Sequence, residues 1–113
     1  MRLISQKGME YMDIPYERSI LYVIESRDTG YIIYANCNIN GYPVARYSKV
    51  ENAEKVMKIL HNVYANPIIE FDDMDEFKKY IVITTYKATE NPKRVKLDGN
   101  NCVFRFPQED ELR

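Results

Sequence analysis

The sequence predicts an α+β domain in which an antiparallel meander sheet packs against one long helix and one shorter helix. The first 47 residues are rich in β-branched and aromatic residues interrupted by turn formers. At Ser48 the pattern changes to the 3–4 spacing of a helical face. A length of 113 residues, 45% of them hydrophobic, suits a single domain spanning 1–113. Its expected parts are an N-terminal sheet (1–47), a helical segment (48–81) and C-terminal strands (82–107).

The N-terminal sheet is predicted from extended segments separated by turns. Arg27-Asp28-Thr29-Gly30 is rich in turn residues. Asn40-Gly41 is the strongest hairpin signal, because a type I′ turn needs positive φ at both central residues. Pro15 indicates an edge position for its strand. The expected strands are residues 2–5, 12–16, 19–25, 31–36 and 42–47.

The long helix is predicted over residues 49–65. Ser48 and Glu51 have the spacing of a capping box, and Pro67 disfavours helical geometry just after the end. A shorter helix is expected after Asp72 and Asp73, passing into a strand near residues 81–86. Apolar residues spaced three and four apart mark the buried face of the long helix: Ala53, Val56, Met57, Leu60, Val63 and Tyr64.

The last strand carries one arginine between two phenylalanines. Asp98-Gly99 is a second hairpin signal, and it predicts that residues 95–97 pair with this strand. Since side chains alternate along a strand, Arg105 points away from the face shared by Phe104 and Phe106. A rigidly anchored guanidinium suits recognition of a phosphate or a carboxylate.

Several functions are excluded by what the sequence lacks. A net charge of −1 argues against duplex nucleic acid as a partner, and no apolar run is long enough for a membrane span. Cys37 and Cys102 are too few and too far apart for a metal site, and they indicate buried thiols in the cytoplasm. His61 is the only histidine, and no P-loop or nucleophile elbow is present. We therefore expect no enzyme activity, no cofactor and no metal.

Basic and aromatic residues indicate a binding site instead. Arg46 ends a strand close to the start of the long helix, which is a favourable place for an anion. Arg94 belongs to a basic cluster within residues 87–96. Tyrosine is frequent, with ten residues, and rings such as Tyr80 could stack on a base whose phosphates the arginines hold. A solvated basic face that balances the acidic tail is the competing interpretation.

Three short stretches together resemble a known group of proteins. They are residues 1–6 with 13–17, Phe104-Arg105-Phe106-Pro107, and Ala45-Arg46-Tyr47-Ser48 opening a helix with Glu54-Lys55. The pattern is similar to small proteins of phages and prophages of Firmicutes. It also resembles the anti-Thoeris sponge family, the first described group of Thoeris anti-defence proteins.

This resemblance implies sequestration without turnover. Members of the family bind cyclic ADP-ribose isomers made by bacterial TIR-domain enzymes, and some also bind cyclic oligonucleotides. They assemble as dimers or larger oligomers and act in the host cytoplasm. By resemblance, Arg46 and Arg105 would contact phosphates, Tyr80 would stack on a ring, and Asn91 would contact a base or ribose.

Two other functions stay open from the residues alone. A phage accessory protein could bind a host protein through a Tyr-rich sheet. The protein could also be a weak single-stranded nucleic-acid binder that uses the basic residues of 87–96.

Overall fold

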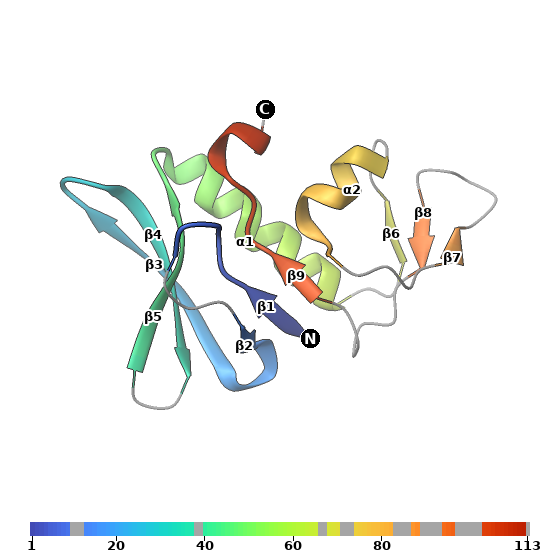
Figure 1. The fold of residues 1–113 in the computed structure, drawn as a ribbon, viewed down its shortest axis with the longest axis horizontal. Helices are drawn as coiled ribbons and strands as arrows, with labels where there is room; N and C mark the ends of the chain where they lie inside the picture. The colour runs from blue at the N-terminus through green and yellow to red at the C-terminus, as the bar shows by residue number, and fades with distance from the viewer. Residues whose placement is uncertain are drawn as a thin grey trace.

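Three small sheets and two helices make up the fold (Figure 1). The computed structural model describes residues 1–9, 13–37, 40–65, 68–70, 74–82, 87–88, 94–96 and 103–112. The strands are β1 (Arg2–Ile4), β2 (Ile14–Pro15), β3 (Ser19–Ser26), β4 (Gly30–Cys37), β5 (Asn40–Tyr47), β6 (Ile68–Glu70), β7 (Lys87–Ala88), β8 (Arg94–Lys96) and β9 (Val103–Arg105). The helices are α1 (Val50–Ala65) and α2 (Met74–Tyr80), with 3₁₀ turns η1 (Tyr16–Arg18) and η2 (Glu109–Leu112).

The largest sheet is the antiparallel meander β3–β4–β5, which confirms the predicted α+β class. It lies at one end of the molecule, and the sheet β6–β8–β7 lies at the other (Figure 1). Helix α1 begins one residue after its predicted start. The agreement is this close because the apolar residues of its buried face have clear helical spacing. Helix α2 is also present where a shorter helix is expected.

One face of the meander packs against α1 and forms the core. Cross-strand partners point to the same side of a sheet, so Ile33 and Ala45 share this face with the pair Tyr31 and Tyr47. Ile33, Ala45 and Tyr47 are fully buried. The helix contributes Ala53, Val56, Leu60 and Val63.

The opposite face of the meander is partly exposed. Ile20 is 69% exposed and Ile24 is 45% exposed. Between them, the rings of Tyr22 and Tyr34 stack with centroids 5.6 Å apart. This surface, defined by Ile20, Tyr22, Ile24 and Tyr34, is called the open face below.

Gly41 has a different role from the one that the sequence suggests. Asn40 and Gly41 lie inside β5, with Asn40 paired to Cys37, so the prediction that they form the centre of the turn is wrong. A Cβ at Gly41 would come within 2.6 Å of the Tyr22 hydroxyl. The glycine therefore leaves room for a tyrosine of the open face.

The last strand also pairs differently from the prediction. β9 runs parallel to β1, with Leu3 opposite Phe104, whereas β8 pairs with β6 and β7. The expected hairpin between residues 95–97 and the last strand is therefore wrong. Side-chain alternation in β9 is confirmed, because Phe104 and Phe106 are buried and Arg105 is partly exposed. The expected strand at 83–86 lies outside the described residues.

Candidate functional site

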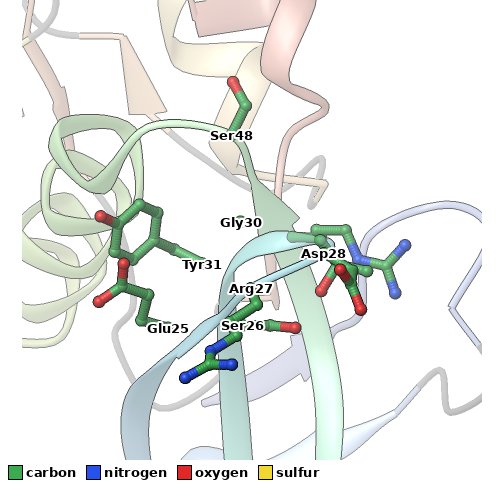
Figure 2. Close-up of a pocket in the computed structure, with 9 residues that line it drawn as sticks. Glu25, Ser26, Arg27, Asp28, Gly30, Tyr31 and Ser48 are labelled. Atoms are coloured by element: carbon green, nitrogen blue, oxygen red, sulfur yellow. The ribbon is translucent and has the colours of Figure 1, made fainter.

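A hollow of about 600 Å³ lies at the end of the β3–β4 hairpin, where β5 leads into α1 (Figure 2). Such a volume is within the roughly 300–1,000 Å³ of small-molecule sites. We call it the hairpin hollow. Its walls come from the β3–β4 hairpin end, the end of β5 and the residue that follows β5: Glu25, Ser26, Arg27, Asp28, Thr29, Gly30, Tyr31, Arg46 and Ser48.

Gly30 allows the hairpin end to lie close to β5. Its φ is +84°, a conformation that side chains rarely adopt. A Cβ at this position would also lie 2.5 Å from the backbone oxygen of Tyr47. Gly30 therefore fixes the distance between the charged turn and the strand that carries Arg46.

The lining side chains lie on both sides of the hairpin end. Figure 2 shows Tyr31 and Glu25 on one side and Asp28 on the other. Arg46 is paired to Ile32, which places it on the open-face side of the sheet. A ligand that lies across the end of the hairpin can therefore meet both groups.

The hollow combines the polar groups that nucleotides use. Arg27 and Arg46 supply guanidinium groups for phosphate, and both are exposed. Glu25 and Asp28 supply carboxylates, which accept hydrogen bonds from ribose hydroxyls. Tyr31 adds an aromatic ring. The two charges of each sign cancel, so a ligand with both acidic and hydroxyl groups fits better than a simple anion.

The backbone of Arg46 is held by a partly buried polar contact that we call the Gln6 clasp. The Gln6 side chain accepts a hydrogen bond from the Arg46 N–H at 2.8 Å and donates one to the Pro107 carbonyl at 2.9 Å. The Tyr47 hydroxyl donates to the same carbonyl at 2.7 Å. Burial raises the pKa of the Tyr47 phenol far above its usual range, so it remains a donor at neutral pH.

The start of α1 already has an anion from within the chain. The Ser48 N–H and hydroxyl both donate to the carboxylate of Glu109. A carboxylate of the chain itself therefore lies just before this helix, where the helix dipole favours an anion. Three stretches that are distant in the sequence meet in the Gln6 clasp, through Gln6, through Arg46 with Tyr47, and through Pro107.

Arg105 lies outside the hairpin hollow. Its guanidinium forms an ion pair with Glu111 at 2.5 Å, and its Nε donates to the Lys78 carbonyl at 3.4 Å. The side chain is 34% exposed. A phosphate could reach it only by displacing or sharing Glu111. The structure does not bring Arg105 and Arg46 together in one cavity of the described residues.

Tyr80 is a core residue, which corrects its assignment as a stacking ring. It is fully buried, and its ring lies 6.0 Å from that of Phe104. Burial, with the charges of Glu76 and Glu111, raises the pKa of its phenol to about 12. A ring without exposed surface cannot stack on a ligand base.

The two remaining predicted site residues are Asn91 and Arg94. Asn91 is outside the described residues. Arg94 opens β8, where its backbone pairs with Glu70 of β6.

Sequence reasoning missed most of the hollow. The sequence pattern identifies Arg27 and Asp28 only as turn residues, although two opposite charges at a hairpin end are also a signal for a polar site. For Tyr31 the pattern predicts only a strand position, and for Ser48 only a helix cap. No sequence signal places Gln6 beside Arg46, since the contact joins residues 40 apart.

Comparison with known proteins gives no match: no family model, curated protein or solved structure is significantly similar to the chain. In the described part of the chain, no helix has the length and apolar character needed to cross a membrane.

Proposed function

We propose that the protein binds a cyclic nucleotide signal of bacterial immunity and sequesters it without degrading it. The ligand class is a cyclic ADP-ribose isomer or a cyclic oligonucleotide, and the setting is a phage protein that acts as a homo-oligomer in the host cytoplasm. The observation that carries the proposal is the pair of guanidiniums, the pair of carboxylates and the tyrosine ring around the hairpin hollow.

The chemistry of the ligand supports this assignment. Cyclic ADP-ribose isomers carry two phosphates, ribose hydroxyls and one adenine. Arg46 and Arg27 match the phosphates, Glu25 and Asp28 match the hydroxyls, and Tyr31 matches the base. Tight binding without turnover needs donors that are already in position, and the Gln6 clasp positions the backbone of Arg46.

Arg105 is the second candidate for a phosphate contact. Its ion pair with Glu111 is partly exposed, so its net stabilisation is small, about 0–1 kcal/mol. Each phosphate of such a ligand carries one negative charge, as the Glu111 carboxylate does, and it could accept the same paired hydrogen bonds from the guanidinium. The two arginines can be separated by experiment because they lie in different places.

The test is a thermal shift with cyclic ADP-ribose isomers and cyclic dinucleotides, followed by heat denaturation and mass spectrometry of the released ligand. A stabilised protein that returns the ligand intact supports the proposal. Arg46→Ala should abolish the shift, and Lys58→Ala, an equal charge change on the exposed side of α1, should preserve it. Arg105→Ala reports on the second candidate contact.

A second function is favoured by the open face. Ile20 and Ile24 are exposed beside the stacked rings of Tyr22 and Tyr34, and aromatic and apolar residues of this kind are frequent at protein interfaces. The protein would then bind a host protein through this surface. Absence of a thermal shift with every cyclic nucleotide would reject sequestration and favour this second function.

A further inference from the structure

Strand β3 forms an edge of the meander sheet. Its eight residues pair with β4 on one side, and in the described part of the chain no strand pairs on its other side. An edge strand presents unpaired N–H and C=O groups along its length. At about 3.4 Å per residue, this edge extends about 27 Å.

The residues of β3 do little to prevent pairing with another strand. Edge strands are usually protected by lysine, proline or a bulge. Between Ser19 and Ser26 the only charged residue is Glu25, and there is no proline. The register with β4 runs without a shift from Ser19 to Ser26. β3 is therefore long, regular and apolar at its centre.

We propose that β3 pairs with β3 of a second copy of this chain, antiparallel and centred on Tyr22, to join the two meanders into one six-stranded sheet. In this register Ile20 lies opposite Ile24 of the partner subunit, and the two-fold axis repeats the contact. Leu21 lies opposite Val23 of the partner subunit on the other face. The most exposed apolar residues of the strand thus cover one another.

Register and charge both favour this arrangement. A shift by one residue would place the open face of one copy beside the helix-covered face of the other. The strand is preceded by Arg18 and ends near Glu25, and both are exposed. Antiparallel pairing brings Arg18 to the Glu25 end of the partner, whereas parallel pairing would bring like charges together.

The pairing also affects the hairpin hollow. Ser19 lies opposite Glu25 of the partner subunit, so Arg18 lies beside the partner's turn at residues 27–29. That turn lines the hollow. Each hollow would then gain a third guanidinium from the other copy. This consequence rests on the proposed function, but the strand pairing does not.

The expected affinity follows from the size of the contact. A standard interface buries about 800 Å² per partner, which is roughly a tenth of the 7404 Å² accessible surface of this chain. A single edge strand with its flanking turns is at the small end of this range. We therefore expect a dimer that dissociates on dilution into the micromolar range.

The test compares two double variants by sedimentation velocity over a dilution series. Ile20→Lys with Ile24→Lys places two like charges in each cross-strand contact and should raise the dimer dissociation constant at least tenfold. Ile20→Lys with Ile24→Glu changes the same two exposed positions but pairs opposite charges, so it should retain the dimer. A wild-type protein that is monomeric at all concentrations, or a Lys–Lys variant that dimerises like wild type, overturns the proposal.

Cross-linking tests the register in an otherwise native strand. Opposed residues of an antiparallel pair have Cα atoms about 4.5–5.5 Å apart, which a disulfide can bridge. Ile20→Cys with Ile24→Cys should form a disulfide-linked dimer on oxidation, and Ile20→Cys alone should not, although both retain Cys37 and Cys102. Equal cross-linking in both variants contradicts the register. Neither experiment involves a nucleotide, so failure here counts against the homo-oligomer but leaves nucleotide sequestration to its own test.

Discussion

The Gln6 clasp allows a quantitative prediction, because two side chains share one acceptor. Both Gln6 and the Tyr47 hydroxyl donate to the Pro107 carbonyl, and Gln6 also accepts from the Arg46 N–H. Tyr47→Phe removes one hydrogen bond and should cost about 1 kcal/mol of unfolding free energy. Gln6→Ala removes two and should cost about 2 kcal/mol. In each single variant the carbonyl keeps one donor.

The double variant should cost more than the sum of the two singles. It leaves a buried carbonyl with neither donor, which adds about 1 kcal/mol to the summed loss of about 3 kcal/mol. Far-UV circular dichroism during urea unfolding suits the measurement, since the chain has no tryptophan. Gln108→Ala is the control: it removes an exposed hydrogen bond to the Lys7 carbonyl and should change stability by less than about 0.5 kcal/mol. Additivity of the two singles within about 0.3 kcal/mol would refute the shared acceptor.

Three further predictions concern glycines and buried phenols. Gly30→Ala should destabilise the protein by more than about 2 kcal/mol, because strain at positive φ adds to a collision with the Tyr47 oxygen. Gly8→Ala is the control, since Gly8 has φ +95° but open space around it, and it should cost about 1 kcal/mol in the same urea titration. Gly41→Ala should lower the melting temperature, and Tyr22→Phe should restore much of the loss if the hydroxyl is the obstacle. Tyr80 ionises at pH 10.0 when unfolded but at about 12 when folded, so its contribution to stability is complete below pH 10 and declines toward pH 12. The urea midpoint should therefore fall as the pH is raised from 9 to 11, and it should fall less steeply in Tyr80→Phe than in the wild type.

The elements with a local pattern could be predicted from the sequence. Helix α1 differs from its prediction by one residue, since a run of apolar residues at helical spacing needs no distant partner to be recognised. The meander strands follow for a similar reason, because each is bounded by turn residues close by. Gly41 shows the limit of this reasoning. Asn-Gly predicts a turn, but glycine is required at this position because the Tyr22 hydroxyl, on another strand, leaves no room for a Cβ.

The candidate site depends on contacts that no local pattern contains. Arg46 was identified because it stands between a strand and a helix, and the structure places it in the hairpin hollow. Tyr80 was misassigned, since aromatic residues have the same local pattern whether they are buried or exposed. The partner of Arg105 lies six residues away, on a 3₁₀ turn that returns toward β9, and an acidic tail alone does not predict such a return.

The parallel pairing of β1 with β9 has a consequence for the order in which the chain folds. Leu3 lies beside Phe104, and Gln6 contacts a residue 101 positions away. At a synthesis rate of roughly 5–20 residues per second, about 5–20 s pass between the translation of β1 and that of β9. In that interval the meander and α1 can form from local contacts, but the apolar side of β1 has no partner strand in β9. Until residues 103–105 are translated, β1 therefore exposes apolar surface that β9 covers in the folded structure, which favours aggregation and chaperone binding.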